Sequence, residues 1–104
     1  MRTFAPPVTS FDDIAVRLRE RTDSLRAFDV DAVTVFGSFA GGDFDGDSDV
    51  DLIVEPGPAN FTALLDLQDL LESALMRRVD VLTPGAMKPR LAGEVARTGR
   101  RITL

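Results

Sequence analysis

Short apolar runs that end at glycine or proline alternate with stretches of helical periodicity along this chain of 104 residues. The runs are rich in β-branched residues, which favour strands, whereas the other stretches repeat apolar residues at three- and four-residue spacing. We expect strands over about 32–36, 50–55, 79–83 and 100–104. We expect helices over about 11–28, 61–76 and 87–98. This alternation in so short a chain predicts one α/β (α+β) domain over 1–104, built around one sheet.

The composition excludes several kinds of catalytic site. The chain contains neither cysteine nor histidine, so thiolate nucleophiles, imidazole bases and zinc sites built on these residues are ruled out. Catalysis would have to use carboxylates, hydroxyls, Lys or Arg, backbone amides, or metals held by oxygen. We expect a cytoplasmic protein, because the sequence shows neither a signal peptide nor an apolar run long enough to span a membrane.

Negative charge is concentrated in the middle of the chain. Residues 27–76 contain eleven acidic residues and no Lys or Arg, and Asp occupies every second position from 43 to 51. Such repulsion destabilises a fold unless cations offset it. A solvated acidic face is the ordinary explanation for scattered acids, but the regular spacing here favours bound divalent cations.

Three aspartates and a Gly-Ser pair form the candidate site. Gly37-Ser38 directly follows a predicted strand, where a helical turn would present backbone N–H groups and a hydroxyl to phosphate. Asp49 and Asp51 lie on one face at the start of the next strand, and Asp80 lies alone in the apolar third strand. Carboxylates without His or Cys select Mg²⁺ or Mn²⁺. The alternative is that these carboxylates occupy an exposed strand end and a sheet edge.

A calcium-binding EF-hand loop is a competing explanation for the alternating aspartates. That loop requires Gly at position 6 and Glu at position 12. A loop starting at Asp43 has Ser48 and Val54 at these positions, and one starting at Asp45 has Val50 and Pro56. Neither frame fits, so the pattern argues against this calcium site.

At these residues the chain resembles the minimal nucleotidyltransferases of the DNA polymerase β superfamily. That family has Gly-Ser after its first strand, Ser-Asp-x-Asp-Leu on its second and a lone Asp on its third, which here match Gly37-Ser38, 48–52 and Asp80. The resemblance implies a small mixed sheet packed with helices. It also implies two Mg²⁺ ions (or Mn²⁺), both bound by Asp49 and Asp51 and one also by Asp80, with Gly37 and Ser38 holding the triphosphate of ATP.

Stand-alone members of this size resemble antitoxins that are paired with a HEPN-type RNase toxin. The resemblance implies that such a protein transfers AMP from ATP to a tyrosine hydroxyl of the toxin and thereby neutralises it. Two alternatives stay open: an antitoxin that only binds its partner, its transferase site having decayed, and a transferase for a small molecule or a nucleic-acid hydroxyl. The scarcity of basic residues near the site argues against direct binding of nucleic acid.

Two features of the sequence leave questions for the structure. The family usually reads Gly-Ser-x-Ala-Arg-Gly, but here Gly41 follows Ala40, so a positive charge near the phosphates is missing unless Lys88 or Arg90 replaces it. The predicted helix over 61–76 has an apolar face much wider than the ~100° stripe of a one-sided helix. Either a partner covers part of this face, or the domain packs against it on two sides.

Overall fold

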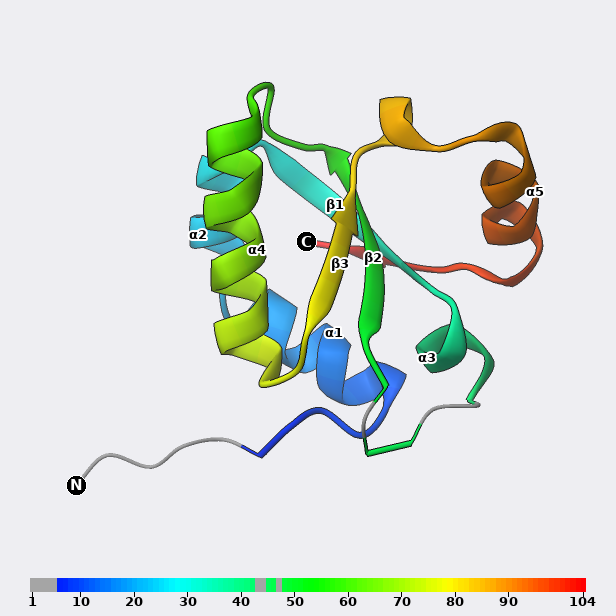
Figure 1. Ribbon diagram of the computed structural model, residues 1–104. Coiled ribbons are helices and arrows are strands. Elements are labelled where there is room, and N and C mark those ends of the chain that lie inside the picture. Colours follow the sequence, from blue (N-terminus) through cyan, green and yellow to red (C-terminus); the bar gives the residue numbers. More distant parts are fainter. Residues whose placement is uncertain (1–5, 43–44, 47) are drawn as a thin grey trace.

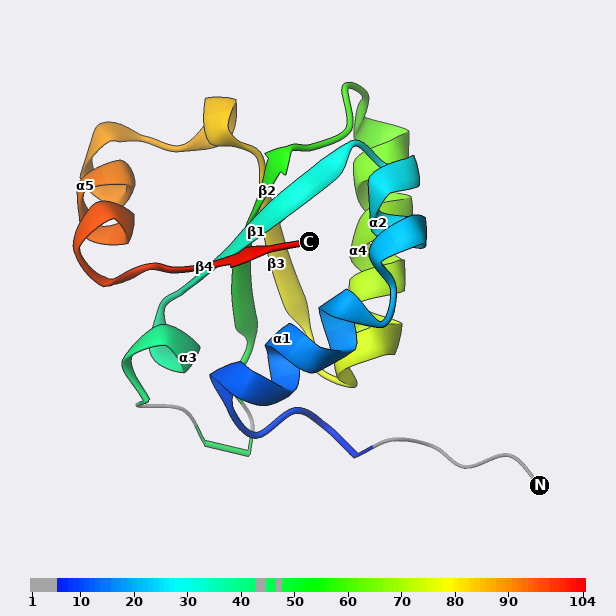
Figure 2. The same ribbon diagram turned by 180° about the vertical axis from the view of Figure 1, so that it is seen from behind.

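The computed structural model describes residues 6–42, 45–46 and 48–104, and in this part of the chain the elements form three layers (Figures 1 and 2). The strands are β1 (Val30–Phe36), β2 (Val50–Pro56), β3 (Val79–Leu82) and β4 (Arg100–Thr103). The helices are α1 (Phe11–Arg19), α2 (Thr22–Ala27), α3 (Ser38–Gly41), α4 (Phe61–Leu75), the 3₁₀ turn η1 (Pro84–Ala86) and α5 (Pro89–Thr98). The strand order is β3-β2-β1-β4, with β2 and β3 parallel and the other pairs antiparallel. The predicted fold class, a small mixed sheet packed with helices, is confirmed.

The prediction of one helix over 11–28 is wrong, because the chain forms α1 and α2 there. Ser10 caps the start of α1, since its hydroxyl accepts the Asp13 N–H at 3.0 Å. At the far end the Thr22 hydroxyl donates to the Arg19 carbonyl at 2.8 Å, a local bond that competes with continuation of the helix. The third predicted helix begins later than expected, at Pro89, where the missing proline N–H costs no helical bond.

The two faces of the sheet differ in what covers them. Val33 and Val35 of β1 lie on the face that α1, α2 and α4 cover, with Leu52 and Val54 opposite them in register. These side chains are buried in the main core. We call the opposite face the site face; α3 and α5 lie on its side of the sheet (Figures 1 and 2). Strand periodicity places Asp51 and its register neighbours on the site face.

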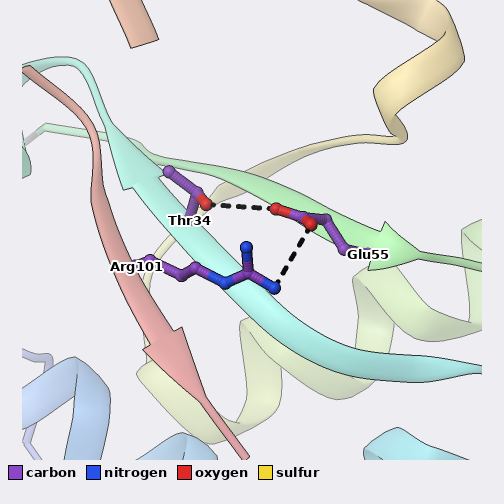
Figure 3. Close-up of polar contacts among 3 residues, drawn as sticks. All are labelled: Thr34, Glu55 and Arg101. Atoms are coloured by element: carbon purple, nitrogen blue, oxygen red, sulfur yellow. Dashed lines mark hydrogen bonds and ion pairs between the residues drawn. The ribbon is translucent and has the colours of Figure 1, made fainter. Parts of the chain in front are cut away.

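A polar contact crosses three strands of the site face (Figure 3). The hydroxyl of Thr34 on β1 donates to Oε1 of Glu55 on β2 at 3.5 Å, and Arg101 of β4 pairs with Oε2 of Glu55 at 3.5 Å. The Arg101 side chain is 60% exposed, so solvent screens this ion pair and its stabilisation is at most about 1 kcal/mol.

The wide apolar face of α4 is only partly covered in the described structure. Leu67, Leu71 and their neighbours toward the sheet are buried, whereas Phe61 is 72% and Leu65 is 47% exposed. Packing on two sides therefore does not account for the whole face. Within the described residues, no helix has both the length and the apolar character that crossing a bilayer requires.

Candidate functional site

The turn between β1 and α3 brings the backbone of Gly37 against the carboxylate of Asp51. Gly37 has φ +71° and ψ −147°, a conformation that is essentially restricted to glycine. A Cβ at this position would collide with Oδ2 of Asp51. Ser38 then begins the single helical turn α3 that the sequence predicted. Gly37 is thus required twice, for its backbone angles and for the close approach of the carboxylate.

The parallel pairing of β2 and β3 places Asp51 directly opposite Asp80. Asp51 is half-buried and Asp80 is exposed. Burial raises the pKa of Asp51 to about 6, with further contributions from the charge of Asp80, a hydrogen bond to its carboxyl group and the charge of Asp49. The two strands therefore crowd like charges at one point on the site face.

Asp49 lies just before β2 and is exposed. Over the described residues, no three acidic side chains form a ready-made metal site. The donor set nevertheless fits Mg²⁺ or Mn²⁺, because it consists of carboxylate oxygens. A divalent cation would also offset the burial and the repulsion by Asp80 that raise the pKa of Asp51. The joint binding of metal by Asp49, Asp51 and Asp80 stays a prediction, as does the binding of phosphate by Gly37 and Ser38.

Arg77 contacts the site from the α4–β3 turn and was missed by the sequence reasoning. Its Nη1 donates to the carbonyl oxygens of Asp45, Gly46 and Ser48 at 3.1–3.2 Å, and its Nε donates to that of Val8 at 2.7 Å. The available signal was the charge distribution, since Arg77 is the first cation after the fifty residues that have none.

A cavity of about 460 Å³ opens beside Asp49. The residues that line it are Pro7, Gly46, Ser48, Asp49, Met76, Arg77 and Arg78. Asp51 and Asp80 do not line this cavity, so among the three predicted metal ligands it adjoins Asp49.

The described structure brings neither Lys88 nor Arg90 to the carboxylates through a hydrogen bond or an ion pair. Both residues are exposed, at the start of α5. Gly41 is also exposed, at the end of α3. The replacement of the usual arginine by a cation from α5 therefore has no support in the contacts of the described residues.

Comparison with known proteins identifies relatives of the same fold. Residues 13–103 match the model of the family described as polymerase beta, nucleotidyltransferase. A solved structure described as a candidate minimal nucleotidyltransferase is 34% identical, with a TM-score of 0.61 over 83% of this chain and 93% of that one. Among curated proteins, no significant sequence match was found.

Two more distant structures share the fold. A toxin–antitoxin complex with AMP-PNP contains a chain that is 23% identical, with a TM-score of 0.69 over 84% of this chain and 70% of that one. A complex of a tri-AMPylated HEPN toxin with an MNT antitoxin, from Shewanella oneidensis, gives 20% identity and a TM-score of 0.58 over 85% and 70% of the two chains. These two structures show the shared fold, whereas the family match and the 34% identical structure confirm the resemblance to minimal nucleotidyltransferases.

Proposed function

This chain belongs to the polymerase β nucleotidyltransferase family, and from that membership we propose that it is an antitoxin that transfers AMP from ATP to a tyrosine of a HEPN-type toxin. The observation that carries the proposal is the contact between the Gly37 backbone and Asp51, which itself faces Asp80. A turn suited to phosphate thus adjoins a pair of carboxylates suited to a divalent cation. The toxin–antitoxin complexes of the same fold support the choice of partner.

In the proposed reaction the acceptor oxygen attacks the α-phosphorus of ATP. The new bond joins this oxygen to phosphorus, the bond from phosphorus to the bridging oxygen breaks, and pyrophosphate leaves. Mg²⁺ or Mn²⁺ held by Asp49, Asp51 and Asp80 would lower the pKa of the acceptor hydroxyl and neutralise the leaving group. Gly37 and Ser38 would hold the phosphates in line with the acceptor. Asp80, the exposed member of the pair, can receive the hydroxyl proton.

The acceptor must belong to another molecule if it is a tyrosine, because this chain contains no tyrosine. A tyrosine hydroxyl has an ordinary pKa near 10, so at pH 7 it is almost wholly neutral. It must therefore approach the carboxylates closely to lose its proton. The exposed positions of Asp49 and Asp80 leave the site accessible to a segment of a partner protein.

Intact-mass spectrometry tests the proposal. The purified chain is mixed with its cognate HEPN-type toxin, ATP and Mg²⁺, and the RNase activity and the mass of both proteins are followed. We expect the toxin to gain adenylyl groups, each with the mass of AMP less water, and to lose activity. Asp51→Asn should abolish the mass gain, whereas the matched change Asp69→Asn on the exposed surface of α4 should preserve it.

Two other results would contradict the proposal in different ways. Inhibition of the toxin without a mass change would support an antitoxin that only binds, the alternative that the missing arginine at Gly41 suggests. A mass gain on this chain would show that Ser or Thr serves as acceptor and would refute transfer to a partner tyrosine.

A further inference from the structure

We propose that Arg77 is a positioning residue that fixes Asp49 relative to the Gly37–Ser38 turn, an inference that rests on the metal site of the proposed function. Arg77 lies at the end of α4, in the turn that leads into β3. Its guanidinium group bonds to the backbone carbonyls of Asp45, Gly46 and Ser48, and Ser48 directly precedes Asp49. It would act through Asp49 and has no contact with substrate in this role.

Asp49 is held by hydrogen bonds on both sides. The carbonyl of Ser48, the residue before it, accepts from Arg77 at 3.2 Å. The N–H of Val50, the residue after it, donates to the backbone carbonyl of Arg78 at 2.9 Å. The Asp49 backbone is therefore tied at both neighbours to two consecutive residues of the α4–β3 turn.

The same guanidinium group also contacts α3, the helical turn that begins at Ser38. It lies over the ring of Phe39, 5.0 Å from the ring centre, a distance at which a cation and an aromatic face attract each other. Phe39 is buried in α3 and directly follows Ser38. Arg77 consequently links the backbone just before Asp49, through the Ser48 carbonyl, to the helical turn that begins at Ser38.

The geometry requires arginine in particular. Nε bonds to the carbonyl of Val8 while Nη1 bonds to the carbonyls of Asp45, Gly46 and Ser48, so the donors diverge from one planar group. Lysine has the same charge, but its compact ammonium group cannot reproduce this fork or stack over Phe39 in the same way. Arg77→Lys therefore keeps the positive charge and removes the forked hydrogen-bond geometry, so any effect on binding comes from the geometry.

Arg78 offers a matched control in the next position. Its side chain is exposed, and its link to Val50 uses the backbone carbonyl, which a substitution retains. Arg78→Lys therefore makes the same chemical change in the same turn without removing the anchor.

The experiment measures Mn²⁺ binding by the purified chain without ATP or partner, from the free-ion electron paramagnetic resonance signal. We expect Arg77→Lys to raise the dissociation constant about tenfold, as the loss of an outer-shell partner does, and Arg78→Lys to change it less than about twofold. In metal-free protein, hydrogen exchange should become faster at amides 48–50 in Arg77→Lys and stay unchanged in β1. Phe39→Leu provides a second variant, which should weaken binding less than Arg77→Lys.

The outcomes separate this inference from the proposed function. If Arg77→Lys lowers the melting temperature but folded protein binds Mn²⁺ as tightly as the wild type, Arg77 has a merely structural role and the inference is refuted. Equal weakening by Arg78→Lys also refutes it, because a change of side chain in this turn that leaves the hydrogen bonds of Arg77 in place would then be enough to weaken binding. If wild-type protein and Asp51→Asn bind Mn²⁺ equally, the metal site of the proposed function fails and the inference fails with it.

Discussion

Replacement of Asp51 by Asn should stabilise the metal-free protein. Burial and the neighbouring carboxylates raise the pKa of Asp51 from 3.8 to about 6, so its charged form is disfavoured in the folded state. A shift of this size corresponds to about 3 kcal/mol, and solvent screening at a half-exposed carboxylate reduces it to about 1–2 kcal/mol. Asn is uncharged, and its amide can donate a hydrogen bond to Asp80. For a domain of this length we expect a rise in melting temperature of about 4–16 °C at pH 7.5.

The stabilisation by Asp51→Asn should depend on pH in a defined direction. The folded state holds the Asp51 proton more tightly than the unfolded state does, because its pKa is the higher one. Protonated Asp51 therefore contributes to the stability of the folded state. This contribution is fully present below about pH 4 and is lost as the pH rises through about 6. The difference in melting temperature between Asp51→Asn and the wild type should therefore be large at pH 7.5 and almost vanish at pH 4.

Thermal unfolding followed by circular dichroism measures this difference with and without Mg²⁺ and ATP. The ligands should raise the melting temperature of the wild type, because they bind the native state, and Asp51→Asn should lose the metal-dependent part of that rise. Asp69→Asn, at an exposed position of α4, is the control for removing one negative charge. If metal-free Asp51→Asn is less stable than the wild type at pH 7.5, the electrostatic reasoning is refuted. If Mg²⁺ and ATP raise the melting temperature of Asp51→Asn as much as that of the wild type, the metal site is refuted.

Three further predictions concern individual residues. Gly37→Ala should lower the melting temperature by at least about 5 °C, because it combines a glycine-only backbone conformation with a collision against Asp51; Gly46→Ala, where a Cβ meets open space, should have little effect on the same measurement. Gly41→Arg should tighten ATP binding in calorimetric titration if the usual arginine contact is merely missing, whereas weaker binding would show that the glycine is needed there. Glu55→Gln removes a screened ion pair and should change the free energy of unfolding by less than about 1 kcal/mol in urea titration.

The parts of the fold that follow local periodicity could be predicted from the sequence. Alternation along 50–55 indicates one apolar face with Val50, Leu52 and Val54, which are buried in the core, and it thereby places Asp51 on the opposite face. The division of the first helix was missed because it occurs at Arg21, whose backbone is non-helical, and beside the bond from the Thr22 hydroxyl to the Arg19 carbonyl. Both helix and turn are compatible with the residues there, so periodicity alone does not decide between them.

The candidate site was predictable in its residues but not in its contacts. The order of the motifs indicated Gly37, Asp51 and Asp80, and the parallel register then placed Asp51 opposite Asp80. The collision that a Cβ at Gly37 would make with Asp51 depends on the backbone path from β1 into α3. Local sequence patterns do not determine this path. Arg77 was missed because its bonds join segments that lie about thirty or more residues away in sequence.

The way Arg77 is bonded matters for the electrostatics of the site. An arginine paired directly with Asp51 or Asp80 would lower the pKa of that carboxylate and would compete with a metal ion for its oxygens. Arg77 instead donates to the carbonyl oxygens of Asp45, Gly46 and Ser48, and these bonds leave the oxygens of the Asp51–Asp80 pair free of it. The repulsion at this pair consequently remains, and after burial the charge of Asp80 is the next largest cause of the raised pKa of Asp51. A fold that keeps this repulsion is less stable without a cation, and the same repulsion strengthens the binding of a divalent cation when one is present.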